Sequence, residues 1–385
     1  MAVSTDASRS EMLDPYMGRI ADLDSHLMIP TRLAGEAFGR LGKVSGAALS
    51  FLFRFNKEAR DALDPAAEAP VAAETVWEVK GVGAPGGMRA DTRLEALSLM
   101  GIDRQLVFPD VLSAFVAWGR QPGALGAMRA HNDYALDWAS DSKGRLVPAA
   151  LLNVRNLDAA VAEARRMADR GARAVMIPDG ILIGGKSPAH PDIDRLWSVL
   201  AEAGISVLLH VGGQHGYTTG KWEQTEVLRT VAKNLGSEGD PIGPHTLATM
   251  HLSPVNYLST LIFGGVLERH PALKVGVMEL GAMWVGPMGE LLDNRVKFTR
   301  RVSGSLSMKP SEFIRRSLRV TPFWQEPVGE IIDRYDLSEV LCFASDFPHR
   351  EGGTDPLGAT AYSLTGQPPE VLEGFFVTNG QLILS

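Results

Sequence analysis

One short stretch of the chain follows an apolar segment with two side chains that often bind metal ions. Residues 340–344 are apolar, and the sequence Ser-Asp-Phe-Pro-His then supplies Asp346 and His349. If residues 340–344 form a buried strand, both side chains lie at its carboxyl end. The carboxyl ends of the strands form the reactive face of a parallel barrel. The stretch therefore predicts two metal ligands on that face.

Three other apolar segments end in the same kinds of residue. The segment at 18–24 leads into the pair Asp24-x-His26, residues 205–210 end in His210, and residues 273–278 are followed by Glu279. Asp24 and His26 are two positions apart, so they point the same way on an extended strand. Strand ends on one rim would bring together six candidate metal ligands: Asp24, His26, His210, Glu279, Asp346 and His349.

Three imidazoles and three carboxylates form a mixed nitrogen and oxygen donor set. This set suits iron or manganese, and zinc less exclusively, because no thiolate is present. It also exceeds the three protein ligands that one catalytic zinc ion usually takes. Two ions with Glu279 between them would use the surplus. Glu279 and His349 are also the candidates for catalytic roles.

Each of these residues also has an ordinary structural interpretation. A lone histidine at a strand end is usually a hydrogen-bonded polar residue, and an aspartate after a strand is often a helix N-cap. The coincidence of six such residues on one rim favours a functional site. Asp22 is expected to support the site rather than to bind metal. The other histidines are interpreted as structural (His131, His190, His270) or as lying above the site with no assigned role (His215, His245, His251).

The elements that would position these residues alternate regularly along the chain. Eight short apolar strands are expected, at about 18–24, 104–108, 146–152, 172–177, 205–210, 273–278, 318–321 and 340–345. Helices are expected between them, and a last helix at about 369–376. Continuous apolar runs are typical of strands buried on both faces. The pattern predicts an α/β fold, a TIM (β/α)8 barrel, with an open doubly wound sheet as the alternative.

We interpret residues 1–385 as a single domain with two irregular parts. Residues 1–15 are expected to form a flexible N-terminus. Residues 30–90 exceed an ordinary barrel connection, so they are interpreted as a helical insertion or lid after the first strand. Aromatic residues there and elsewhere could line an apolar pocket, although ordinary core packing is the favoured interpretation. They are Phe51, Phe53, Phe55, Trp222, Trp284 and Trp324.

The bulk composition excludes several classes of protein. The chain has 385 residues, of which 45% are hydrophobic and 22% charged, and a net charge of −7. It lacks a polybasic block, which argues against nucleic-acid and anionic-membrane partners. Cys342 is the only cysteine, so no internal disulfide can form. With no signal-peptide pattern and no apolar run of the ~20 residues that a membrane span needs, a cytoplasmic location is expected.

One motif is misleading. Residues 180–187 match the P-loop pattern and follow an expected strand. A phosphate-binding loop must open a helix at its Lys-Ser pair, but Pro188 disfavours helical geometry at Ser187. Nucleotide hydrolysis is therefore rejected.

At these motifs the chain resembles the amidohydrolase superfamily, in the branch that contains the aminocarboxymuconate-semialdehyde and γ-resorcylate decarboxylases. The matching landmarks are Asp22-x-Asp24-x-His26, Leu209-His210, residues 264–275, Glu279 to Trp284, and Ser345 to Gly352. Two departures stand out. Asp24-x-His26 replaces the His-x-His of many members, and Glu279 replaces the acid/base histidine of the decarboxylases. The combination is similar to the TIM-barrel nonheme diiron monooxygenases of platensimycin and platencin biosynthesis.

The resemblance implies a first hypothesis, a nonheme diiron monooxygenase with two Fe ions bound by the six candidates. Such an enzyme hydroxylates a C–H bond of a bulky hydrophobic substrate, here a diterpenoid carried as a coenzyme A thioester. Its partners are O2 and an external electron donor, a ferredoxin or reductase. Candidate cations for the coenzyme A handle are Arg295, Lys297, Arg300 and Arg301, although a solvated helix face is the favoured interpretation.

Two alternatives remain open. The wider family implies a mononuclear Zn- or Mn-dependent hydrolase or nonoxidative decarboxylase, with Glu279 or His349 as the acid/base group. A noncatalytic barrel is the weakest alternative, because six convergent ligands are costly to bury without a metal. A homodimer is the default expectation for a barrel of this size.

Overall fold

The computed structural model describes most of the chain. The described residues are 11–28, 68–110, 113–114, 117–120, 122–214, 222, 224–227, 243–299 and 304–385. The predicted insertion at 30–90 is therefore described only from residue 68, and Phe51, Phe53 and Phe55 lie outside the described residues. Most of the predicted flexible N-terminus lies outside them as well. Within these ranges, every helix is too short or too polar to cross a membrane.

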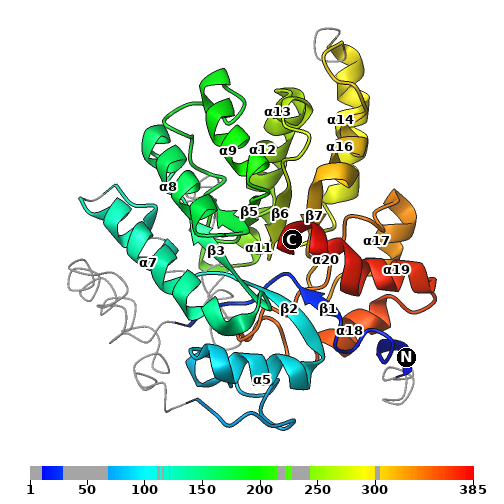
Figure 1. The fold of residues 1–385 in the computed structure, drawn as a ribbon. Coiled ribbons are helices and arrows are strands. Elements are labelled where there is room, and N and C mark those ends of the chain that lie inside the picture. The colour runs from blue at the N-terminus through cyan, green and yellow to red at the C-terminus, as the bar shows by residue number, and fades with distance from the viewer. Residues whose placement is uncertain are drawn as a thin grey trace.

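A curled sheet of seven parallel strands, paired in chain order, forms the centre of the molecule (Figure 1). Most strand residues are apolar and buried, as expected for strands covered on both faces, although the second strand also carries Asp103, Arg104 and Gln105. The strands are β1 (Ile20–Asp22), β2 (Ile102–Val107), β3 (Leu146–Leu151), β4 (Ala174–Met176), β5 (Ser206–His210), β6 (Val275–Met278) and β7 (Leu318–Val320).

The eighth predicted strand, 340–345, does not form a regular strand. The segment nevertheless lies between β7 and β1. Cys342 N donates to Val320 O at 3.0 Å on one side, and Leu23 N donates to Phe343 O at 3.0 Å on the other. Regular pairing is limited to single bridges, in part because β7 offers only three residues. The curled sheet and its helices are consistent with the predicted TIM barrel.

Helices follow the strands and surround the sheet (Figure 1). The sequence specifies their ends locally. Asn156 caps α8 by accepting a hydrogen bond from Ala159 N, and Gly101 ends α5 in the left-handed conformation. The helices include α5 (Ala90–Met100), α7 (Ala124–Trp138), α8 (Leu157–Asp169), α9 (Asp194–Glu202), α11 (Pro244–Thr249), α12 (Leu252–Phe263), α13 (Val266–Arg269), α14 (Val285–Arg295), α16 (Pro310–Ser317), α17 (Val328–Tyr335) and α18 (Pro356–Ser363).

The C-terminal segment is longer than the predicted helix at 369–376. It comprises α19 (Pro369–Glu373), a π-helical turn (Gly374–Thr378) and α20 (Asn379–Leu384). Helix α20 packs near the amino ends of the strands, where Ser206 Oγ donates to Ile383 O at 3.1 Å. Ile383 and Leu384 belong to the same buried cluster as Leu106, Leu208 and other strand residues. The helix therefore fills the end of the sheet opposite the predicted site.

The reactivity of Cys342 tests whether the segment between β7 and β1 is packed as the structure shows. Its side chain is fully buried and donates to Val340 O at 3.6 Å. Burial raises the pKa of the thiol to about 12. Because the thiolate is the reactive form, we expect Ellman's reagent to modify Cys342 only after unfolding in urea. Rapid labelling of the native protein at neutral pH would contradict the packing of this segment.

Candidate metal centre

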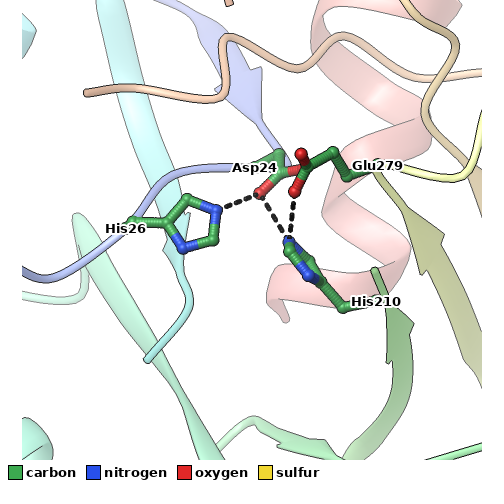
Figure 2. A group of neighbouring side chains, drawn as sticks. All are labelled: Asp24, His26, His210 and Glu279. Carbon is green, nitrogen blue, oxygen red and sulfur yellow. Dashed lines mark hydrogen bonds and ion pairs between the residues drawn. The ribbon is translucent and has the colours of Figure 1, made fainter. Parts of the chain in front are cut away.

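Four of the six predicted ligands gather at the carboxyl ends of β1, β5 and β6. Figure 2 shows Asp24, His26, His210 and Glu279 pointing toward one another. His210 Nε2 lies 3.4 Å from Asp24 Oδ1 and 3.4 Å from Glu279 Oε2. His26 Nε2 lies 3.5 Å from the same Asp24 oxygen. All four residues are buried, so this is a closed cluster of metal-binding atoms.

The other two predicted ligands form a second group with two members of the first. His26 Nε2 lies 3.4 Å from Asp346 Oδ1, and His349 Nδ1 lies 3.0 Å from the same oxygen. The rings of His26 and His349 stack, with centroids 3.8 Å apart. His26, Glu279, Asp346 and His349 each offer a donor atom within 4.8 Å of the others. The two groups therefore overlap, and they share His26 and Glu279.

Backbone carbonyls orient two of the imidazoles. His26 Nδ1 lies 3.5 Å from Pro109 O, and His210 Nδ1 lies 3.1 Å from Val211 O. An Nδ1–H that faces a carbonyl leaves Nε2 with a free lone pair, which is the usual arrangement of a metal-binding histidine. Both Nε2 atoms point into the cluster (Figure 2).

The carboxylates and imidazoles of the cluster are close together and buried, and several of them shift the pKa of a neighbour. Burial opposes charge on His26, yet Asp24 and Asp346 raise the pKa of its imidazole to about 10. Burial likewise opposes charge on the two aspartates. Neighbouring histidines nevertheless hold the pKa of Asp24 and the pKa of Asp346 below their ordinary values. The site therefore attracts positive charge strongly, and a metal ion would compete there with protons.

Two of the carboxylates are presented by unusual backbone. Glu279 has φ of 55° and Asp346 has φ of 51°, in the left-handed region that residues other than glycine seldom adopt. Such conformations cost of order 1–3 kcal/mol each and concentrate at functional sites. Glu279 directly follows the apolar strand β6, and Asp346 follows the apolar run 340–344 after Ser345. The backbone therefore turns sharply where each side chain must enter the cluster.

The residues fit a bound metal. His26 Nε2 and both carboxylate oxygens of Asp346 are buried without a hydrogen bond of acceptable geometry in the described part of the chain. Buried polar groups are normally satisfied, and exceptions call for an explanation such as an ion. Imidazole nitrogens and carboxylate oxygens are donors that Zn, Fe and Mn accept. The site is therefore a buried His/Asp/Glu metal site.

A buried hydrogen-bond network centred on Asp22 supports the cluster. Asp22 accepts hydrogen bonds from Gln105 Nε2 at 2.8 Å and from Ser345 N at 2.9 Å. Ser345 Oγ donates to Asp22 Oδ2 at 2.5 Å, and Asp24 N donates to Asp22 Oδ1 at 3.2 Å. The carboxylate thus holds the backbone beside two candidate ligands, Asp24 and Asp346, and Asp22 belongs to neither metal-binding group.

Arg93 extends this network, and sequence reasoning did not identify it. Its side chain is fully buried in α5. The guanidinium donates to Gln105 Oε1 at 2.8 Å, to His26 O at 2.7 Å and to Gly86 O at 2.5 Å. It also lies 4.7 Å from the centre of the Phe347 ring. One cation therefore fixes both the Asp22 network and the backbone of His26.

The remaining histidines lie outside the two metal-binding groups or outside the described residues. His131 is buried in α7, His190 caps a short turn, and His270 pairs with Asp194 at 3.3 Å. These positions agree with structural roles. His245 and His251 lie at the start of α11 and at the N-cap of α12, while His215 is outside the described residues.

Of the other predicted contact residues, some are buried, some are exposed and some lie outside the described residues. The indole of Trp284 is buried and donates to Gly281 O, as a core residue would, whereas Trp222 and Trp324 are exposed. Arg295 and Lys297 are also exposed, at the end of α14, as the solvated-face interpretation expects. Arg300 and Arg301 lie outside the described residues.

Comparison with known protein families agrees with the fold and the site. Residues 82–381 match the model of the family described as Amidohydrolase. The chain belongs to the amidohydrolase family. With the buried His/Asp/Glu cluster, it is a metal-dependent enzyme of the amidohydrolase superfamily. No match emerged among proteins of curated function.

Several solved structures share the fold over almost the whole chain. An amidohydrolase from Mycobacterium avium subsp. paratuberculosis is 20% identical with a TM-score of 0.67, covering 95% of this chain and 99% of its own. A manganese-bound 5-carboxyvanillate decarboxylase from Novosphingobium aromaticivorans is 13% identical with a TM-score of 0.64, covering 95% and 97%. A 2,6-dihydroxybenzoate decarboxylase from Rhizobium is 15% identical with a TM-score of 0.62, covering 95% and 98%.

These comparisons support the broader of the two resemblances. The amidohydrolase superfamily and its decarboxylase-containing branch agree with them. The solved structures named above are decarboxylases and an amidohydrolase, so the narrower resemblance to diiron monooxygenases has no support from them. At such low identities the likeness shows the fold alone, and the reaction must be argued from the site.

Proposed function

We propose that the centre holds two iron ions and that the enzyme is a nonheme diiron monooxygenase. One observation carries the proposal: the six donors form two overlapping groups of four, which share His26 and Glu279. A single ion would leave part of this set unused, because a catalytic metal usually keeps positions open for water or substrate. Two ions would use all six donors, and Glu279, a member of both groups, would be available to either ion.

The donor set is compatible with iron. It contains imidazole and carboxylate and no thiolate, a composition that suits iron and manganese. When bound, the two ions would supply the redox chemistry that O2 requires. One oxygen atom enters a C–H bond of the substrate and the other leaves as water, so an external donor must provide two electrons. The substrate proposed is a bulky hydrophobic molecule, in keeping with a diterpenoid thioester of coenzyme A.

The chain's own residues exclude water and define the open side of the centre. Asp24, His26 and His210 are each no more than 3% exposed. The side chain of His349 is 27% exposed, which is more than that of any of the other five candidate ligands. Phe108 packs against the ring of His210, with centroids 4.2 Å apart, and supplies an apolar contact beside the centre. Substrate would therefore approach past His349.

A second candidate function is a mononuclear Mn- or Zn-dependent decarboxylase or hydrolase. The comparisons favour it over the first, because the similar solved structures include decarboxylases, one of them with bound manganese. The acid/base group would be Glu279 or His349, both of which lie in the cluster. The arrangement of the donors favours two ions, whereas the similarity of fold favours this second reaction.

Oxygen uptake separates the two candidates. The protein is loaded with Fe(II), mixed with a chemical reductant and followed with an oxygen electrode. We expect reductant-dependent O2 consumption that the Glu279→Gln variant loses and the His190→Asn variant keeps, since His190 is a half-exposed residue outside the centre. In parallel, the Mn-loaded protein is incubated anaerobically with 5-carboxyvanillate and 2,6-dihydroxybenzoate. Release of CO2 there, with no O2 uptake by the iron form, would establish the second function instead.

A further inference from the structure

A groove lies on the loops that follow β2, β3 and β4, on the same face of the sheet as the metal centre. Two adjoining cavities, of about 610 Å³ and about 390 Å³, share Arg155 and Asn156. Their charged lining consists of four basic and two acidic side chains. These are Arg120, Arg155, Lys186 and Arg195, and Asp158 and Asp192.

The acidic side chains of the groove are already engaged. Arg195 pairs with Asp158, and Lys186 pairs with Asp192. Arg120 and Arg155 have no carboxylate within ion-pair distance in the described parts of the chain. The groove therefore carries an excess of two positive charges, which these two arginines contribute.

Arg155 is held in place as a binding residue would be. Its Nε donates to Trp118 O at 2.7 Å and its backbone N donates to the Asn153 side chain at 3.1 Å. The Asn153 amide in turn donates to Ala117 O at 2.7 Å. Burial and the nearby charge of Arg120 lower the pKa of Arg155. Arg120 is exposed but close enough for its charge to act on Arg155, so an anion that contacts both arginines would relieve their repulsion.

The loop that resembles a P-loop contributes to this groove in a different way. Ile183 and Lys186 form a tight antiparallel bridge, and Gly184 and Gly185 have φ of 57° and 76°. The next helical residues begin only at Pro191, so Lys186 does not open a helix as a nucleotide-binding lysine does. The rejection of nucleotide hydrolysis therefore agrees with the structure, while Lys186 and Gly184 still line the groove.

We propose that this groove is an oxyanion site that binds a phosphate group between Arg120 and Arg155. A guanidinium presents paired N–H donors that match phosphate oxygens, and two of them match the charge of a phosphate dianion. The argument is independent of the reaction at the metal centre. The phosphate could belong to an organic phosphoester, such as part of a substrate, or be free inorganic phosphate.

Calorimetric titration of the metal-loaded protein with inorganic phosphate and with phenyl phosphate tests the proposal. We expect saturable binding that weakens at least about tenfold in Arg120→Met and in Arg155→Met, because each loses a charge-assisted hydrogen bond. Arg165→Met, which removes an exposed arginine from the neighbouring helix α8, should bind as the original protein does. Within the described residues Arg120 makes no hydrogen bond, so Arg120→Met should leave the fold intact. That variant therefore keeps the test decisive if Arg155→Met is unstable.

The two ligands separate the sources of the phosphate. Tighter binding of phenyl phosphate would indicate an organic phosphoester, and equal or weaker binding would indicate free phosphate. Binding that survives in both arginine variants but is lost in His26→Ala would place the anion on the metal centre and overturn the proposal. Absence of saturable binding to either ligand would overturn it as well.

Discussion

In the proposed dinuclear centre, replacing His26 with alanine is expected to remove both metal ions. His26 belongs to both groups of donors, and its Nε2 lies within 3.5 Å of carboxylate oxygens in each. Groups that only orient a metal ligand are worth about ten- to a hundredfold in metal affinity. Loss of a donor common to both ions should therefore weaken binding by more than about a hundredfold, and activity should disappear with the metal. The measurement is metal content per chain after gel filtration.

Variants at unshared donors supply the contrast. Asp24→Asn and His349→Ala each affect one group, so each should retain one ion. His190→Asn should retain both ions, because His190 caps a short turn and belongs to neither metal-binding group. Equal metal loss in His26→Ala, Asp24→Asn and His349→Ala would contradict two separable positions and would fit a single ion bound by all of them.

Replacing Arg93 with methionine is expected to damage both stability and metal binding. Methionine fills much of the space but donates nothing to Gly86 O, Gln105 Oε1 and His26 O. Each buried acceptor left unpaired costs about 1–3 kcal/mol, so the free energy of unfolding should fall by about 3 kcal/mol or more. Metal affinity of the folded fraction should fall about ten- to a hundredfold, because the backbone of His26 loses its support.

Two further variants separate positioning from simple loss of stability. Arg89→Met removes an exposed arginine that pairs with Asp91 at 2.6 Å, and such pairs are worth only about 0–1 kcal/mol. Its stability in urea and its metal affinity should both stay near those of the original protein. Arg93→Lys keeps the charge and should recover part of the affinity. Metal affinity that is unchanged in folded Arg93→Met would show that the residue supports the fold and not the site.

The metal-binding cluster could be predicted because its residue types and positions follow a general rule. Asp24, His210, Glu279 and Asp346 each stand at or near the end of an apolar run, and parallel strands bring such ends to one face. Seven of the expected strands occur, most of them shortened by a residue or two. Those positions depend on local apolar runs, which are visible in one sequence.

The supporting residues could not be predicted from the sequence. Arg93 stands between Thr92 and Leu94 in a helix, where an arginine is usually solvated. It is buried by contacts from distant segments, among them Gly86, whose added Cβ would meet the Arg93 backbone at 2.3 Å, and the ring of Phe347. The sequence also does not indicate the left-handed conformations of Glu279 and Asp346, because neither residue is a glycine. Contacts between distant segments decide all of these features.

The eighth strand shows the limit of an apolar run as a signal. Residues 340–345 resemble the other strands in composition, and they occupy the expected place between β7 and β1. The Ser345 side chain and backbone bind Asp22, and Asp346 then turns into the left-handed region. The requirements of the site therefore replace regular pairing at the end of this segment.

The metal content of the unmodified protein tests the central claim most directly. The protein is expressed with added iron, purified without chelator and analysed for all transition metals per chain. We expect two irons per chain, with a Mössbauer spectrum of a coupled pair after exposure to O2. A single manganese or zinc ion that does not respond to O2 would contradict the dinuclear centre and support a mononuclear decarboxylase or hydrolase.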